Sequence, residues 1–232
     1  MTKVQKIAMS MLTLFIFFGV FFMASVYAQG PKKPEVKDIF DSKKEAKISE
    51  VQNLPLKQAF ERLKGMDFLA DRDLLNNAIY NAFKNRIKGA VAFSVEQLKK
   101  PRNEIIDGKL VNRTPDLYVA KKIQQMFPDD SLYHLFSLYE NADPVIRANI
   151  IFALGDMEGD PAVKNLLLAA LDDKTYCQEE EPEMEGEPLR VCDKAYNQLV
   201  LRYEVKNVLR TIGNVHKVED RDYHIEVLRS ML

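Results

Sequence analysis

The 232-residue chain is poor in the side chains on which most catalytic and metal sites depend, with two cysteines, three histidines and no tryptophan. It contains no CxxC motif, no glycine-rich phosphate loop and no Ser-His-Asp pattern, so it offers no recognisable catalytic constellation. Its 33 basic and 34 acidic residues nearly cancel, and a balanced charge gives no bulk attraction to nucleic acid. We therefore expect no enzymatic activity, no cofactor and no nucleic-acid partner.

The three histidines do not suggest a metal site. His216 and His224 lie eight residues apart with Asp220 between them, and they share one face only if a single helix covers both. Two histidines and one acid on a helix face are common on ordinary protein surfaces. We expect no metal there.

The beginning of the chain has the pattern of a secretory signal. Two lysines precede an apolar run over residues 7–23, and residues 24–29 read ASVYAQ. Val26 and Ala28 suit the third and first positions before a signal-peptidase cut, so we expect cleavage after Ala28. The alternative is an uncleaved membrane anchor, because an apolar run of this length can just span a bilayer. Either way, the rest of the chain is expected outside the cytoplasm, periplasmic or secreted.

The sequence divides into a signal peptide at 1–28, a flexible linker at 29–50 and a helical domain at 51–232. The linker is rich in lysine and acid and has few periodic apolar positions. Beyond it, apolar residues recur with the helical period almost throughout. Strand-like alternation is scarce, and its best candidate, residues 90–95, equally suits the start of a helix. The fold class is therefore expected to be all-α.

The clearest structural unit lies between residues 131 and 173, where three helices are expected around two tight turns. The residues expected to shape these turns are Asp143, Pro144, Arg147, Gly155, Asp160 and Pro161. Aspartate caps the unpaired N–H groups at a helix start, proline suits the first helical position, and glycine suits a left-handed exit. A helix, a tight Asp-Pro turn and a second helix form one unit of a helical repeat.

Residues 143–148 (DPVIRA), 153–155 (ALG) and 159–163 (GDPAV) resemble the HEAT repeat of the phycobilisome-lyase type. This resemblance implies a short right-handed α-α superhelix of degenerate HEAT-like helix pairs, in which Asp and Arg near the turn tie adjacent repeats together. Residues 191–199 echo residues 146–154 at an offset of 45, with Cys192 in place of the arginine. Residues 114–127 give a weaker echo.

These features favour an exported, non-enzymatic scaffold or binding protein that uses a HEAT-like helical surface for protein–protein interaction. Its partner is expected to be another protein or an envelope component, with a membrane involved only if the signal segment stays uncleaved. The resemblance also implies an alternative, a lyase-like or small-molecule-binding HEAT protein, because such repeats resemble those of bilin lyases.

The two cysteines, Cys177 and Cys192, flank a segment with two prolines and a glycine. In an exported chain with no other thiol, we expect them to form a disulfide. The alternative is two unpaired thiols. Zinc binding is not expected, because two thiolates without a nearby histidine lack its tetrahedral ligand set.

The segment between the cysteines is strongly acidic. Its candidate binding residues are Glu179, Glu180, Glu181, Glu183, Glu185 and Glu187. They could bind a cation or a basic partner, and the alternative is a solvated loop kept out of the core by its charge. Residues 84–122 have the opposite character, with ten basic residues against four acidic ones. This asymmetry could steer an anionic partner, or it could reflect lysines scattered over outer helix faces.

Overall fold

The computed structural model describes residues 50–66, 72–157, 159–178 and 186–232. The chain divides into two units, Met1–Glu45 and Ala46–Leu232. The first unit, with the expected signal peptide, lies outside the described residues, and so does the linker apart from Glu50. The fold below is that of the second unit.

The described part of the chain is mainly α-helical, which confirms the expected fold class. Its helices are α3 (Leu56–Lys64), α4 (Arg72–Phe83), α5 (Ile87–Leu98), α6 (Thr114–Met126), α7 (Pro128–Glu140), α8 (Pro144–Leu154), α9 (Pro161–Ala169), α10 (Val191–Tyr203) and α11 (Val218–Met231), with a 3-10 turn η1 (Ala170–Asp172). The expected strand candidate at 90–95 belongs to α5. Among the described residues, no helix has both the length and the apolar character of a membrane span.

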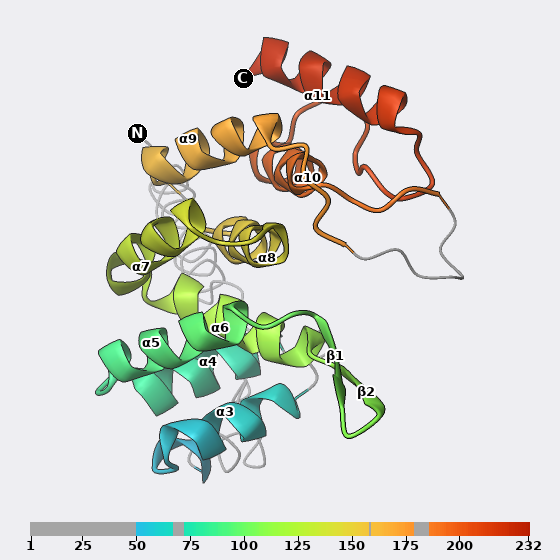
Figure 1. Cartoon of the computed structure of the whole chain (residues 1–232). Helices are drawn as coiled ribbons and strands as arrows, with labels where there is room; N and C mark the ends of the chain where they lie inside the picture. Colours follow the sequence, from blue (N-terminus) through green and yellow to red (C-terminus); the bar gives the residue numbers. More distant parts are fainter. Residues whose placement is uncertain (1–49, 67–71, 158, 179–185) are drawn as a thin grey trace, which may run out of the picture. The chain divides into compact units, whose positions relative to one another are not determined.

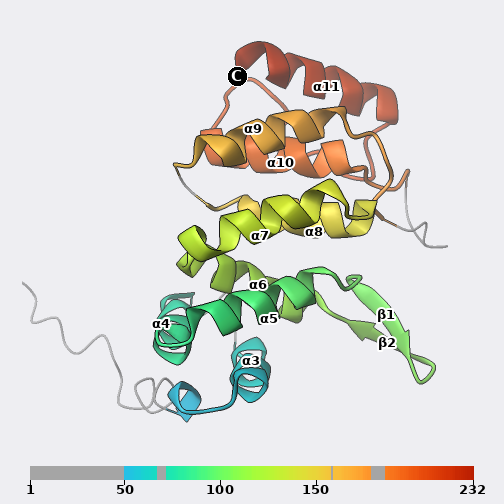
Figure 2. The same cartoon turned by 60° about the vertical axis from the view of Figure 1, so that its left-hand side comes forward.

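Six of the helices form three successive pairs, α5–α6, α7–α8 and α9–α10 (Figure 2). The second helices of the pairs stack on one another, because α6 packs on α8 and α8 packs on α10 (Figure 1). On the other side α5 packs on α7, whereas α7 and α9 do not pack closely. The layer formed by α6, α8 and α10 is therefore closely packed throughout, whereas the layer formed by α5, α7 and α9 is open between α7 and α9.

The sequence echoes fall on equivalent helices. Residues 114–127, 146–154 and 191–199 lie in or at the end of α6, α8 and α10, the three helices of the stacked layer. Leu154 and Leu199, which the offset of 45 equates, are both fully buried. The internal similarity thus falls on three helices of the same layer.

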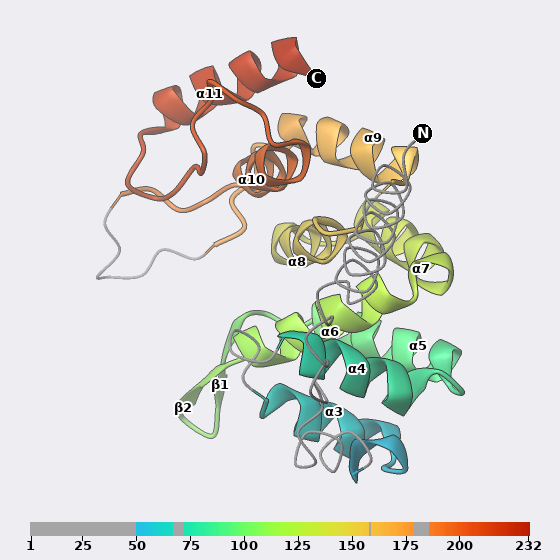
Figure 3. The same cartoon turned by 180° about the vertical axis from the view of Figure 1, so that it is seen from behind.

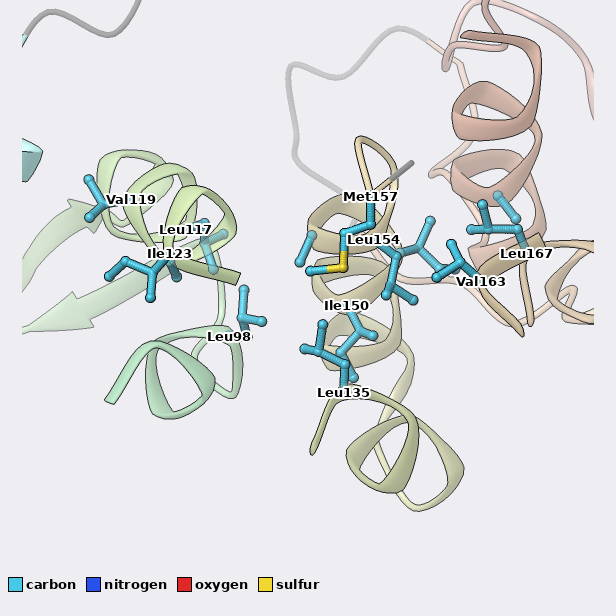
Figure 4. Packing of buried hydrophobic residues seen from close by; sticks show 14 of the residues in the cluster. Leu98, Leu117, Val119, Ile123, Leu135, Ile150, Leu154, Met157, Val163 and Leu167 are labelled. Carbon is cyan, nitrogen blue, oxygen red and sulfur yellow. The ribbon is translucent and has the colours of Figure 1, made fainter. Parts of the chain in front are cut away.

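A continuous apolar core joins the pairs. Figure 4 shows Leu135 of α7 beside Ile150 of α8, with Leu154 of α8 and Val163 and Leu167 of α9 completing this part of the cluster. All five side chains are fully buried. Each such side chain contributes roughly 1.5–3 kcal/mol on burial, so contacts of this kind dominate the stability of the stack.

A β-hairpin between α5 and α6 was not expected from the sequence. Strands β1 (Asn103–Ile106) and β2 (Lys109–Asn112) pair antiparallel and project beyond α6 (Figures 1 and 2). The turn residues Asp107 and Gly108 have φ values of 52° and 74°. Two successive positive φ values define the turn that suits the twist of a two-residue hairpin.

The C-terminal helix α11 packs closely on α10 alone among the described helices. Residues 204–217 connect the two, and Figure 3 shows this connection looping out from the helices before α11 begins. Other contacts of α11 include ion pairs, such as that between Arg229 and Asp172 at 2.6 Å, and hydrogen bonds from Arg221 to backbone carbonyls. Its attachment therefore depends on one helix face and on polar contacts.

Candidate functional site

Both Asp-Pro turns begin their helices with a side-chain cap. The Asp143 carboxylate accepts a hydrogen bond from Ile146 N–H at 2.9 Å, with Pro144 as the first residue of α8. The Asp160 carboxylate accepts one from Ala162 N–H at 2.8 Å at the start of α9. These caps fix where each helix starts and so set the spacing between α7, α8 and α9.

Arg147 joins α8 to the helix pair that follows. Its Nε lies 2.8 Å from Asp173 Oδ2, just after η1, and its Nη2 donates to Thr175 Oγ1 at 3.0 Å. Nη1 donates to the carbonyl of Ala142 in the preceding turn at 3.2 Å. One guanidinium therefore connects the turn before α8 with the segment after η1.

The gap between α7 and α9 forms a cavity of about 660 Å³, which we call the α7–α9 groove. Its lining residues are Phe136, Tyr139, Glu140, Arg147, Ala162, Asn165, Leu166, Ala169, Ala170, Asp172 and Asp173. The walls are mostly apolar or small, and the Arg147–Asp173 ion pair contributes to the lining. Volume and composition both fall in the range of ligand-binding sites in proteins.

The titratable side chains that line the groove are Tyr139, Glu140, Arg147, Asp172 and Asp173. Burial raises the pKa of the Tyr139 hydroxyl to about 12, and the Asp173 carboxylate adds to this effect. The phenol therefore stays protonated, as a hydrogen-bonding group. Arg147 and Asp173 neutralise each other, and Asp172 is paired with Arg229.

A second cavity of about 600 Å³ lies between the α6–α7 turn and the α8–α9 turn. Its lining is more polar and includes Asp129, Asp156 and Asp160. Asp156 is already paired with Lys121 at 3.1 Å. Within the described ranges, no group of three or more histidines, cysteines or acids is placed to hold a metal ion.

Gly155 does not make the expected left-handed exit from α8. Its backbone is right-handed helical, with φ −54° and ψ −33°. The position instead allows close approach of α10, because a Cβ there would lie 1.7 Å from Gln198 Oε1. The glycine after α8 with a positive φ is Gly159, at 84°.

The expected disulfide between Cys177 and Cys192 is not formed, because both residues are free, buried thiols. An antiparallel bridge joins Tyr176 to Arg190. In the same pairing, Cys177 N–H donates to Leu189 O at 2.9 Å, so Cys177 lies level with Leu189. Cys192 is the second residue of α10, and its N–H donates to Asp173 O at 2.9 Å, four residues before Cys177. The two cysteines therefore lie opposite different residues of this pairing and not opposite each other.

Most of the acidic segment lies outside the described residues. This applies to Glu179, Glu180, Glu181, Glu183 and Glu185. Glu187 is described, and its carboxylate accepts a hydrogen bond from Tyr176 OH at 3.3 Å. Next to it, Gly186 has a φ of 86°, and a Cβ there would lie 2.0 Å from Asn214 O. The end of the acidic segment is therefore held against the connection before α11.

Sequence reasoning missed a buried ionic cluster around Asp193. This carboxylate accepts hydrogen bonds from Arg190 Nη2 at 2.9 Å and from Arg221 Nη1 at 3.1 Å. The Arg221 guanidinium also donates to four backbone carbonyls, those of Glu187, Pro188, Asn214 and His216. We call Arg190, Asp193 and Arg221 the arginine cluster. An arginine on an otherwise polar helix such as α11 gives no sequence signal of burial.

The two C-terminal histidines do not share a helix. Lys217 is the N-cap of α11, so His216 lies before the helix and His224 within it. His216 Nδ1 accepts a hydrogen bond from Gly213 N–H at 3.0 Å, which closes a local turn. His216 and His224 therefore do not lie on one face of a single helix.

Comparisons of the chain with protein-family models, with curated proteins and with solved structures give no match.

Proposed function

We propose that this protein is a non-enzymatic binding module whose α7–α9 groove holds a segment of another protein. In this proposal the stacked pairs are degenerate HEAT-like repeats, and the resemblance of residues 143–163 to that family supports it. The observation that carries the proposal is that one helix layer is closely packed and the other is open between two of its helices. The α6–α8–α10 layer is continuous, whereas α7 and α9 stand apart and leave a cavity of about 660 Å³.

The groove best suits an amphipathic helix. Phe136 and Leu166 offer apolar contact from opposite walls, and Ala162 and Ala169 leave room for the partner's side chains. Helix-in-groove recognition uses apolar anchors of this type, spaced by turns of the bound helix. Glu140 is exposed at the same site, so a basic residue flanking the apolar face of the partner would find a counter-charge.

The proposed compartment is outside the cytoplasm. The support is the signal-like beginning of the chain, with its lysines, its apolar run and the cleavage pattern around Ala28. Free cysteines are compatible with that compartment here. Both thiols are buried, and the backbone pairing around Tyr176 and Arg190 sets them opposite different residues.

A second candidate function is binding of a small molecule in the same groove. The specific observation in its favour is the cavity size, since drug-sized ligands occupy pockets of roughly 300–1,000 Å³. This is the form in which the lyase-like alternative would apply to the chain.

Co-purification from the native host, followed by mass spectrometry of bound protein and of bound small molecules, tests both candidates. Ala162→Arg and Ala169→Arg fill the groove with a long charged side chain and should abolish retention of the ligand. Ala92→Arg is the matched control, because Ala92 is exposed on α5 and does not line the groove. A partner that is retained equally by all three variants would show that the groove is not its site.

A further inference from the structure

The hairpin exposes a pair of large apolar side chains. Ile105 and Leu110 face each other across the two strands and keep 75% and 71% of their surface exposed. Isolated exposed aliphatic residues are ordinary, but two placed directly opposite each other on a projecting element form an exposed apolar patch. A two-stranded hairpin alone is also only marginally stable in water.

The same residues present free backbone groups. Arg113 N–H donates to Arg102 O at 2.6 Å, which fixes the alternation of hydrogen-bonded pairs along the hairpin. In that alternation Ile105 and Leu110 form a non-hydrogen-bonded pair, so their N–H and C=O groups point outward to the two sheet edges. Exposed edges of this type are templates for pairing with another strand.

We propose that the hairpin pairs with the hairpin of a second copy of this chain. Strand β1 of one copy lies antiparallel to β1 of the other, with the two Ile105 residues opposite each other across a two-fold axis. The result is a four-stranded sheet in the order β2–β1–β1–β2. An apolar row of Leu110, Ile105, Ile105 and Leu110 then crosses one face.

The charge pattern favours the β1 edge. Arg102 lies at the base of the hairpin and Asp107 at its tip, so antiparallel β1 strands bring each base cation beside the acidic turn of the other copy. The two Glu104 carboxylates come diagonally close, but each is already neutralised by Arg113 of its own copy, at 2.6 Å. These contacts make the edge self-complementary.

The β2 edge lacks this complementarity. Pairing of two β2 strands about Leu110 would set the two Lys109 side chains diagonally across from each other. Lys109 forms no ion pair within the described residues, so this repulsion would be uncompensated.

A lipid surface is a poorer occupant than a second copy. Inserted into a bilayer, the two free edges would leave backbone N–H and C=O groups without partners, which costs several kcal/mol for each group. Asp107 would enter first, because it forms the tip of the hairpin. Strand pairing satisfies one edge and leaves Asp107 in water. Because the strands have only four residues each, we expect a reversible dimer rather than an obligate one.

Cysteine crosslinking of the full-length protein tests both the pairing and the edge. Opposed residues in a hydrogen-bonded antiparallel pair have Cα atoms about 5.5 Å apart, within disulfide reach. Ile105→Cys should therefore form a reducible covalent dimer under mild oxidation. Leu110→Cys is the matched control, because the two Leu110 positions lie about 14 Å apart across three strand spacings. Wild-type protein has only buried cysteines and should stay uncrosslinked.

Equilibrium sedimentation of the unmodified protein gives an independent readout. Its average mass should rise with concentration from monomer toward dimer, and Ile105→Lys should abolish the rise. Leu201→Lys, at another exposed leucine, should leave it unchanged. A wild-type monomer at every concentration, or equal crosslinking of Ile105→Cys and Leu110→Cys, would overturn the proposal. Binding of monomeric protein to anionic vesicles through Ile105 would also overturn it, in favour of a lipid partner.

Discussion

Arg221 of α11 and Asp193 of α10 form an ion pair of 3.1 Å in which neither side chain is exposed. Burying two charges is costly unless their remaining hydrogen-bonding groups are satisfied. Here Arg190 supplies further donors to the carboxylate, and backbone carbonyls accept the other Arg221 donors. The pair therefore fastens the C-terminal helix to the stacked layer.

Arg221→Leu should lower the free energy of unfolding by about 3–5 kcal/mol, because it leaves the Asp193 carboxylate with an incomplete partner set in the interior. Urea denaturation followed by circular dichroism measures the change. The control is Arg229→Leu on the same helix, which removes a pair with the exposed Asp172 and should cost at most about 1 kcal/mol. Equal effects of the two variants would contradict the assigned role of the arginine cluster.

The cysteines should be unreactive in the folded protein. Burial raises the pKa of the Cys177 thiol to about 11 and that of Cys192 to about 12, so the reactive thiolate is scarce at neutral pH. Thiol labelling at pH 8 should be slow in the native state and rapid after denaturation, and Leu201→Cys should label at once as an exposed reference. A peptide pair linking Cys177 to Cys192 in a non-reducing digest would contradict the structure.

Gly155→Ala should destabilise the protein by about 1–3 kcal/mol, because the new methyl group overlaps the Gln198 side chain and forces it to move. A second change, Gln198→Ala, should recover part of this loss. Gly65→Ala is the matched glycine control, since its Cβ would meet no atom closer than 3.5 Å. Thermal denaturation of the four proteins separates close packing from a general effect of adding a methyl group.

Acid should weaken the junction between α10 and α11. Burial alone would raise the pKa of Asp222, but Lys174 and Arg190, each at 2.9 Å, outweigh it and hold the pKa below its ordinary value. A carboxyl group with a lowered folded-state pKa stabilises the fold above its unfolded pKa, and this contribution is lost as the pH falls through the folded value, below about 4.

Asp222→Asn should therefore lower the free energy of unfolding at pH 7 and flatten its decline below about pH 4. The exposed Asp220→Asn, two residues earlier on α11, serves as the control. An unchanged pH profile in Asp222→Asn would show that the ionic contacts of this carboxylate do not contribute to stability.

The sequence predicted the helices and their starts well, because those depend on local chemistry. The apolar period and the Asp143 and Asp160 caps involve residues within a few positions of one another, so they can be recognised in the sequence without knowledge of the tertiary structure. The role of Gly155 and the burial of Arg221 depend on side chains 43 and 28 residues away, Gln198 and Asp193. Contacts between residues this far apart produce no recurring pattern in a single sequence.

The hairpin is a different case, because its signal was present. Residues 103–112 read NEIIDGKLVN, and an Asp-Gly pair flanked by apolar residues is a strong short-range hairpin pattern. The apolar residues on both sides of the hairpin recur with the helical period, and each strand has only four residues. The hairpin pattern was therefore overlooked in favour of helices. The groove could not be predicted, since no local sequence pattern indicates whether α7 and α9 pack against each other.

The stacking of helix pairs also bears on how the domain assembles and opens. Because each pair packs mainly on its sequence neighbours, most contacts form over short stretches of chain, a pattern associated with rapid folding. Among the described helices, the last one has only α10 as a close neighbour. Amide hydrogen exchange should show α11, among the described helices, opening separately from the stacked pairs once the arginine cluster is broken.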